Sequence, residues 1–167
     1  SGVALVAIRK DFAAKGNISL PTMLRYQTHI DENSLYNTPP TFGIYMVKLV
    51  TGWVLNTVGG LEKMEAINRQ KAALLYEAID KSNGFYRGHA EPSSRSIMNV
   101  TWRLPNEELE AEFIKQAKAR GLSELKGHRS VGGIRASIYN AMPTEGVKAL
   151  HDFMLEFASQ NAAAQTK

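Results

Sequence analysis

The sequence contains no cysteine at all, and this absence excludes several classes of chemistry together. Without thiols the chain has no disulfide scaffold, no cysteine nucleophile and no thiolate zinc site. Its His, Asp and Glu residues show no metal-ligand spacing either. No uninterrupted apolar run approaches the roughly 20 residues that a membrane span needs. We therefore expect a globular, cytoplasmic protein with no bound metal and no association with membranes.

The excess of charge of one sign is also small. The chain has 20 Lys and Arg against 16 Asp and Glu, which gives a formal net charge of +4. The basic residues are scattered rather than gathered into the stripe that is typical of a polyanion reader, so we do not expect nucleic-acid binding. A modest positive excess suits small anionic metabolites instead. With 167 residues the chain is long enough for one or two small domains.

The distribution of apolar residues predicts an α/β protein. Residues 3–8 (VALVAI) form an apolar run typical of a fully buried strand, and residues 19–41 are predicted to be a long irregular connection. Apolar side chains at three- and four-residue spacing predict helices over 41–56 and 61–81. The remaining predicted elements are a strand over 96–104, a helix over 105–120, short strands over 122–125 and 135–139, and a helix over 143–158.

The predicted domain boundary lies within the second long helix. We assign residues 1–65 to the remnant of a larger domain and residues 66–167 to a small self-contained α/β domain. Because the chain begins directly on an apolar strand without neighbouring strands, we expect it to be a piece of a longer protein. The first region should then expose apolar surface, since a parallel strand is normally covered on both faces. The side chains predicted to face inward from the second helix are Met64, Ile67, Ala72, Leu75 and Ile79.

The most informative segment is the glycine-rich stretch GHRSVGGIR at residues 127–135. It carries three side chains that can be cationic, those of His128, Arg129 and Arg135. Glycine lets a ligand approach the backbone closely, arginine offers a planar fork that matches a carboxylate or phosphate, and histidine adds a donor that titrates near neutrality. The pattern favours an anion-binding loop, although a solvated basic turn fits the composition about equally well. Arg135 fits that alternative poorly, because it adjoins an apolar strand and no acid nearby in sequence would pair with it.

A second candidate lies in the stretch SLYNTPPT at residues 34–41. Asn37 and Thr38 precede two prolines, so their donors are held in a rigid extended loop that leads to a helix. That arrangement suits a phosphate. The alternative is a plain helix-entry turn in which Asn37 and Thr38 bond only to the local backbone, and the segment taken alone favours this alternative.

The two segments resemble signature stretches of the phosphoserine aminotransferase family. The long matches are SLYNTPPTF at residues 34–42 and GHRSVGGIRASIYNA at residues 127–141, and the shorter ones are KAALLY at 71–76 and MNV at 98–100. The resemblance covers nearly the whole chain, and the matches occur in the family's order. It implies the fold of the type I pyridoxal-phosphate transferases, also called the aspartate-aminotransferase type. The two predicted domains would be the end of the large cofactor-binding domain and the small C-terminal α/β domain.

The resemblance also implies an activity and residue roles. Family members are homodimeric, pyridoxal 5'-phosphate-dependent enzymes of serine biosynthesis. They transfer an amino group from glutamate to 3-phosphohydroxypyruvate, or in the reverse direction from phosphoserine to 2-oxoglutarate. By resemblance, Asn37 and Thr38 would bind the cofactor phosphate in the active site of the partner subunit. Arg135 would hold the substrate α-carboxylate. His128 and Arg129 would contribute to the pocket for the phosphate or the glutamate side chain.

One departure from the family pattern concerns the catalytic lysine. The resemblance implies a lysine that holds the cofactor as a Schiff base just ahead of the strand at residues 3–8, which would place it before Ser1. Lys10 follows that strand and is predicted to be a surface residue. We therefore expect no catalytic residue in this chain and no transamination by the chain alone. The alternatives are a related aminotransferase with another acceptor, and a non-catalytic truncated product or interaction domain.

Overall fold

The computed structural model describes residues 2–161, which form two compact units. Unit 1 is Ser1–Val58 and unit 2 is Gly59–Lys167. The division falls slightly before the expected 65/66 boundary, because helix α4 (Leu61–Asp80) lies wholly in unit 2 and packs there against another helix. Residue 1 and residues 162–167 of the two predicted domains lie outside the described residues. The assignment of the domains to a large and a small aminotransferase domain stays a prediction.

Unit 1 is helical. The elements of unit 1 are α1 (Lys10–Ala13), the 3-10 helix η1 (Thr22–Leu24), α2 (Tyr26–Asp31), α3 (Thr41–Trp53) and the π-helical turn η2 (Val54–Val58). The prediction of a wholly irregular connection over residues 19–41 was therefore wrong, because η1 and α2 form within it. The long helix predicted from residue 41 is confirmed. Thr41 is its first residue, and the Thr41 hydroxyl donates to the carbonyl oxygen of Pro39 at 3.3 Å.

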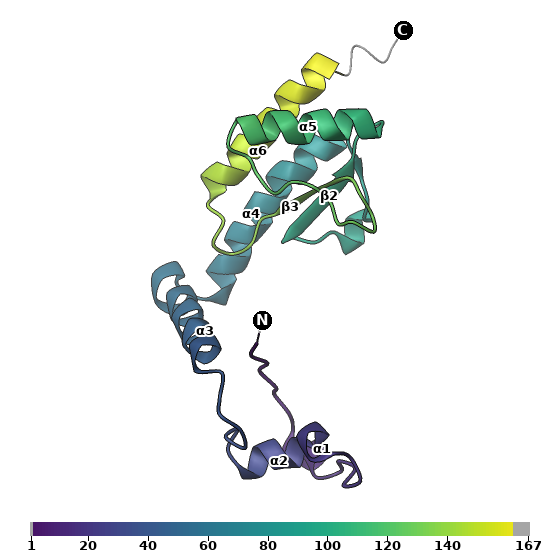
Figure 1. Cartoon of the computed structure of the whole chain (residues 1–167). Helices are drawn as coiled ribbons and strands as arrows, with labels where there is room; N and C mark the ends of the chain where they lie inside the picture. The colour runs from purple at the N-terminus through teal and green to yellow at the C-terminus, as the bar shows by residue number, and fades with distance from the viewer. Residues whose placement is uncertain (1, 162–167) are drawn as a thin grey trace. The chain divides into compact units, whose positions relative to one another are not determined.

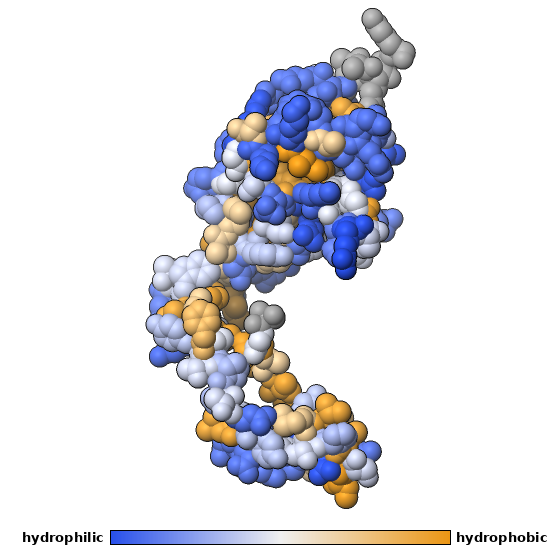
Figure 2. Space-filling model, in the orientation of Figure 1, coloured by the Kyte–Doolittle hydropathy of each residue, from blue (hydrophilic) through white to orange (hydrophobic). Residues whose placement is uncertain are grey.

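The predicted buried strand over residues 3–8 does not form among the described residues, and that prediction was wrong. A strand is stable only when neighbouring strands pair with it, and unit 1 contains none in its described part. Leu5 is 90% exposed. The expected exposure of apolar surface in this region is confirmed, as Figure 2 shows for this unit. Its exposed apolar side chains include Leu5, Val6, Phe12, Ile18, Leu24, Leu35, Phe42 and Leu55.

Unit 2 is an α/β layer structure. Its antiparallel sheet has the order β1 (Arg87–Gly88), β2 (Asn99–Arg103) and β3 (Ile134–Ser137). Helices α4, α5 (Glu107–Ala119) and α6 (Thr144–Asn161) pack with this sheet (Figure 1), and a short 3-10 helix, η3 (Pro92–Ser94), precedes β2. These elements confirm the α/β class and most of the predicted order.

The register of the sheet separates an apolar face from a polar one. Trp102 pairs with Ile134, and both side chains are buried, whereas Thr101 pairs with Arg135, and both are only partly buried. Residues 122–125 do not form the predicted strand. Beside β3 there is instead a single bridge between Lys126 and Ile134, since the chain turns there into a glycine-rich loop.

Aromatic rings fill the core between the sheet and the helices. Phe113 of α5 is fully buried, and its ring meets those of Tyr86, Trp102 and Phe157 edge-on, with centroids 5.1–6.1 Å apart. Edge-to-face contacts of this kind are favourable beyond the area that they bury. The Tyr86 hydroxyl donates to the carbonyl oxygen of Met154 at 2.8 Å. Burial raises the pKa of Tyr86 well above its usual range, so the hydroxyl keeps the proton that it donates.

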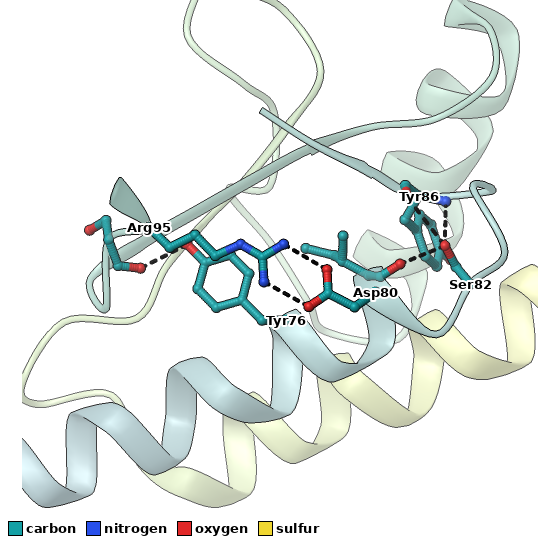
Figure 3. Close-up of polar contacts among 7 residues, drawn as sticks. Tyr76, Asp80, Ser82, Tyr86 and Arg95 are labelled. Atoms are coloured by element: carbon teal, nitrogen blue, oxygen red, sulfur yellow. Dashed lines mark hydrogen bonds and ion pairs between the residues drawn. The ribbon is translucent and has the colours of Figure 1, made fainter. Parts of the chain in front are cut away.

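The C-terminal end of α4 is tied to the segment before β2 (Figure 3). Arg95 donates to both carboxylate oxygens of Asp80, at 2.7 and 2.6 Å, and its guanidinium lies 4.5 Å from the centre of the Tyr76 ring. The hydrogen bond from Arg95 lowers the pKa of Asp80 below its usual value. Ser82 closes the helix end, because its hydroxyl donates to Ile79 and accepts from the backbone of Tyr86.

A lysine is completely buried on the inner face of α4. The Nζ atom of Lys71 donates to the carbonyl oxygens of Tyr139, Met142 and Ile138 at 2.8, 3.0 and 3.3 Å. An ammonium group has three donors, and each finds an acceptor here. Burial nevertheless lowers the pKa of Lys71. Through these bonds α4 holds the turn between β3 and α6.

The inner face of α4 differs from the prediction at one position. Ile67 is 37% exposed, while the neighbouring Asn68 is buried and its Nδ2 donates to the side-chain oxygen of Asn140 at 2.8 Å. The inward positions predicted for the other four apolar residues, Met64, Ala72, Leu75 and Ile79, are all confirmed. Among the described residues, no single helix is long and apolar enough to cross a membrane, although Thr41–Val58 and Leu61–Asp80 taken together meet those criteria by length and composition.

Candidate functional site

The glycine-rich segment forms a closed loop ahead of β3. The N–H of Gly127 donates to the carbonyl oxygen of Gly133 at 2.8 Å, and the N–H groups of Val131 and Gly132 both donate to the carbonyl oxygen of His128. A Cβ atom on Gly127 would lie 2.0 Å from the carbonyl oxygen of Gly132, so no side chain fits there. Gly132 and Gly133 have φ angles of +73° and +71°, which glycine adopts at little cost. The loop therefore needs glycine at all three positions.

His128 and Arg129 are exposed at the start of this loop. The Nδ1 atom of His128 accepts from the N–H of Ser130 at 3.3 Å and lies 2.7 Å from the Ser130 hydroxyl oxygen. The other ring nitrogen, Nε2, makes no hydrogen bond with any described residue. The Arg129 guanidinium likewise forms no hydrogen bond or ion pair within residues 2–161. The loop thus presents two side chains with unused hydrogen-bonding nitrogens.

Arg135 occupies the middle of β3. Its N–H donates to the carbonyl oxygen of Leu125 at 2.8 Å, which fixes the backbone. The side chain is partly buried, and its Nε atom is buried without a hydrogen-bond partner in the part of the chain that the structure describes. Most buried polar groups of proteins are paired, and a desolvated guanidinium N–H is costly unless an acceptor reaches it. The buried Nε atom of Arg135, like that of Arg95, thus has an unused donor, and for Arg135 an anion is a candidate partner.

Two of the three cationic residues, Arg129 and Arg135, line neighbouring cavities, whereas His128 lines neither of them. Arg129 lines an open cavity of about 670 Å³ together with Arg103, Glu107 and Glu110. Arg135 lines a second cavity of about 430 Å³, next to Ser137 and Met142 among others. Lys126 contributes to both walls. The structure thus brings His128 and Arg129 together on one loop and places Arg135 in the adjoining cavity.

Asn37 and Thr38 lie in unit 1 on the exposed connection before α3. The Asn37 amide donates to the sulfur of Met23 at 3.3 Å, which is a weak acceptor. The Thr38 hydroxyl makes no hydrogen bond with any residue in the described range. The helix-entry alternative required hydrogen bonds from both side chains to the local backbone, and neither side chain makes one within the described range. The Thr38 hydroxyl and the Asn37 amide, whose one partner is a weak acceptor, are both suited to donate to the oxygens of a phosphate.

Two residues of the site escaped the sequence reasoning. Arg103 at the end of β2 donates from Nη1 to the carbonyl oxygen of Val131 at 3.0 Å, and from Nε to Oε1 of Glu110 at 2.6 Å. Val131 is 28 positions away in the sequence, so no local pattern reveals this contact. The one available signal was an acidic residue, Glu110, on the inner face of the amphipathic helix α5.

The sequence and the structure both match known proteins. Residues 1–150 match the family Aminotransferase class-V. The phosphoserine aminotransferase of Lysinibacillus sphaericus is 58% identical over 161 residues, which are 96% of this chain and 44% of that protein. The structure of phosphoserine aminotransferase from Bacillus circulans subsp. alkalophilus matches with a TM-score of 0.86 and 55% identity, covering 92% of this chain and 42% of that chain.

A further solved structure is that of a phosphoserine aminotransferase from Trichomonas vaginalis with pyridoxal phosphate bound. It matches with a TM-score of 0.76 and 40% identity, over 83% of this chain and 39% of that one. The chain thus spans less than half the length of these relatives. The match extends over most of the chain in sequence and in structure, and it confirms the resemblance found from the motifs. The chain belongs to the class-V aminotransferase family and is a homologue of the phosphoserine aminotransferases.

Proposed function

We propose that this chain is the substrate-anion-binding part of a phosphoserine aminotransferase. The observation that carries the proposal is the buried Nε atom of Arg135, which has no partner among the described residues, beside a loop whose His128 and Arg129 side chains also have unused hydrogen-bonding nitrogens. A carboxylate or phosphate would satisfy these donors with charge-assisted hydrogen bonds, which are stronger than neutral ones. The identity to phosphoserine aminotransferases supports a phosphorylated substrate.

The two cavities suggest a division of roles. Arg135, on a rigid strand, holds the α-carboxylate that phosphoserine, 3-phosphohydroxypyruvate, glutamate and 2-oxoglutarate have in common. His128 and Arg129, on the exposed loop, bind the end at which these substrates differ: a phosphate in one pair and a side-chain carboxylate in the other. Both ends are anions with several acceptor oxygens, so a guanidinium and an imidazole can serve both.

The cofactor of this reaction is pyridoxal 5'-phosphate. In the proposed enzyme the Asn37 amide and the Thr38 hydroxyl bind its phosphate, in the active site of the partner subunit of a homodimer. The bound cofactor supplies an electron sink for the amino-acid carbon. Residues 1–65 then belong to the large cofactor-binding domain and residues 66–167 form the small C-terminal domain of the type I fold. The place of the reaction in serine biosynthesis belongs to the same proposal.

The chain's own contribution is to bind and orient the substrates. Lys10, the lysine nearest to the apolar run at residues 3–8, is exposed. The expectation that these 167 residues alone do not transaminate stays a prediction. It is checked by running the assay that tests the proposed function with the 167-residue chain alone.

That assay measures amino transfer from glutamate to 3-phosphohydroxypyruvate by the complete gene product that contains these residues, with Arg129→Ala as the variant. We expect the KM for 3-phosphohydroxypyruvate to rise roughly ten- to a hundredfold, because a charge-assisted hydrogen bond to the phosphate is lost. Lys118→Ala, which removes one exposed positive charge from α5, is the control and should leave KM unchanged. If Arg129→Ala spares the activity, the protein is an aminotransferase with another acceptor.

A further inference from the structure

The Arg103 side chain is held in place by the buried carboxylate of Glu110. The Nε atom of Arg103 donates to Oε1 of Glu110 at 2.6 Å, and only 9% of the Glu110 side chain is exposed. The same oxygen accepts from the backbone N–H of Leu104 at 3.3 Å. A buried carboxylate with two donors has a fixed position, because its displacement would leave a charge unpaired. Glu110 therefore joins α5 to the end of β2 and fixes the direction of the Arg103 side chain.

The other side of the Arg103 guanidinium supports the glycine-rich loop. Its Nη1 atom donates to the carbonyl oxygen of Val131. A Cβ atom on Gly133 would lie 2.5 Å from Cδ of Arg103, and one on Gly132 would lie 3.4 Å from Nη1. The loop backbone thus rests directly on the Arg103 side chain. Among the described residues, Arg103 is the only one outside the loop whose side chain donates to the backbone of residues 127–133.

The contacts of Arg103 differ from those of Arg129 on the same cavity wall. Arg129 uses none of its donors within the described residues, whereas Arg103 uses Nε and Nη1 for bonds within the protein. A guanidinium with two nitrogens committed in fixed directions is suited to hold a backbone in place.

We infer that Arg103, braced by Glu110, is a positioning residue that holds the glycine-rich loop in the conformation in which His128 and Arg129 bind a substrate anion. The inference rests on the proposed anion-binding role of the loop. In this role Arg103 and Glu110 act through the loop and are not ligands of the anion. Loss of the brace therefore loosens the loop first and weakens anion binding as a consequence.

The effect of removing one negative charge on anion binding distinguishes a positioning role of Glu110 from a purely electrostatic one. Glu110→Gln and Glu107→Gln each remove one negative charge from the same cavity wall. Charge alone would strengthen the binding of an anion in both variants. Glu107 makes no hydrogen bond with Arg103 or with the loop among residues 2–161, so Glu107→Gln is the matched control. Positioning predicts that Glu110→Gln weakens binding although it makes the cavity more positive.

The experiment compares wild type, Glu110→Gln, Glu107→Gln and Arg103→Lys in the 167-residue chain. Hydrogen exchange of the Val131 and Gly132 amides is measured by NMR without ligand, and the dissociation constant of O-phosphoserine is measured by titration. We expect exchange to accelerate and binding to weaken by roughly three- to tenfold in Glu110→Gln and Arg103→Lys, the effect of losing one or two hydrogen bonds. Glu107→Gln should leave exchange unchanged. Arg103→Lys keeps the charge and so isolates the loss of the two-point contact.

Two results overturn the inference. The first is unchanged exchange of both amides in Glu110→Gln and in Arg103→Lys, whatever the ligand does. The second is O-phosphoserine binding in Glu110→Gln that matches Glu107→Gln. If the wild-type chain shows no O-phosphoserine binding at all, the anion-binding role fails instead, and the exchange rates still decide whether Arg103 holds the loop.

Discussion

Units 1 and 2 have similarly apolar sequences but bury them to very different extents. In unit 2, helices α4, α5 and α6 enclose one face of the sheet, and Leu75, Val100 and Phe113 have no exposed surface. In unit 1, Ala13 and Val54 are the only buried apolar residues within the described range. The 13-residue helix α3 contains no buried residue at all. The difference teaches that apolar composition becomes a core only where layers of helix and sheet close around it.

The candidate functional groups follow the same division. Asn37 and Thr38 sit on an exposed connection in unit 1, where few contacts fix them. The loop around His128 and Arg129 is fixed by its own backbone bonds and by Arg103. We therefore expect unit 2 to present its proposed anion-binding groups in a defined geometry before any ligand binds. Rigid supporting elements of this kind make a binding site specific.

The largest effect should come from removing an aromatic ring from the core of unit 2. Phe113→Ala should lower the free energy of unfolding by about 3–5 kcal/mol, because a fully buried ring leaves a cavity. Phe42→Ala on α3, where the side chain is 77% exposed, should change it by less than about 0.5 kcal/mol. Urea denaturation followed by circular dichroism measures both. Equal losses of unfolding free energy in the two variants would contradict the difference in burial between the two units.

The second effect concerns the buried lysine of α4. Lys71→Met should lower the free energy of unfolding by about 2–4 kcal/mol, because three buried carbonyl oxygens lose their donor. The control is Lys63→Met on the exposed side of the same helix, which we expect to be nearly neutral. Both are measured by chemical denaturation. A stabilised Lys71→Met variant would show that desolvation of the ammonium outweighs its three hydrogen bonds.

The third effect separates backbone strain from steric collision. Gly133 and Gly121 both have positive φ, but a Cβ atom would meet Arg103 and the Trp102 carbonyl oxygen only at Gly133. Gly133→Ala should therefore destabilise the chain by about 1–3 kcal/mol more than Gly121→Ala. Thermal denaturation of the two variants provides the comparison. If both substitutions cost the same, the loop does not rest on Arg103.

The smallest effect is a pH dependence from Asp80 (Figure 3). The pKa of Asp80 is held below its usual value of 3.8 by the hydrogen bond from Arg95. The stabilisation is therefore complete above about pH 4 and is lost as the pH falls through the lower, folded-state pKa. Asp80→Asn should reduce this loss of unfolding free energy at acid pH by less than about 1 kcal/mol, since the Asp80 side chain is half exposed. Asp31→Asn in unit 1, whose carboxylate pairs with no Lys or Arg of the described range, should leave the curve unchanged.

Much of unit 2 could be predicted from the sequence, because local patterns and tertiary packing agree there. Helix α4 was predicted over 61–81 and is found at Leu61–Asp80, since the apolar spacing and the flanking Gly60 and Gly84 both mark its ends. The periodicity failed at Asn68 and Lys71, which point inward. Their burial depends on acceptors that lie about 70 positions away, and no local pattern contains that information.

Unit 1 could be predicted less well for a related reason. The run at residues 3–8 has the composition of a buried strand, but a strand also needs neighbours, which the described residues of unit 1 do not supply. For the site, the loop and the partly buried Arg135 followed from residue types. The support by Arg103 and Glu110 did not, because β2, α5 and the loop meet only in the folded structure. The roles of the five proposed ligand residues stay predictions.

The most direct test of anion binding is a residue-resolved NMR titration of the 167-residue chain with O-phosphoserine and, separately, with serine. We predict that amide shifts are concentrated at residues 127–135. We also predict that O-phosphoserine binds roughly tenfold or more tightly than serine, because only the phosphate pairs with His128 and Arg129. Equal affinity for the two ligands, or shifts that leave residues 127–135 unaffected, would contradict the assignment of this loop as the substrate-anion site.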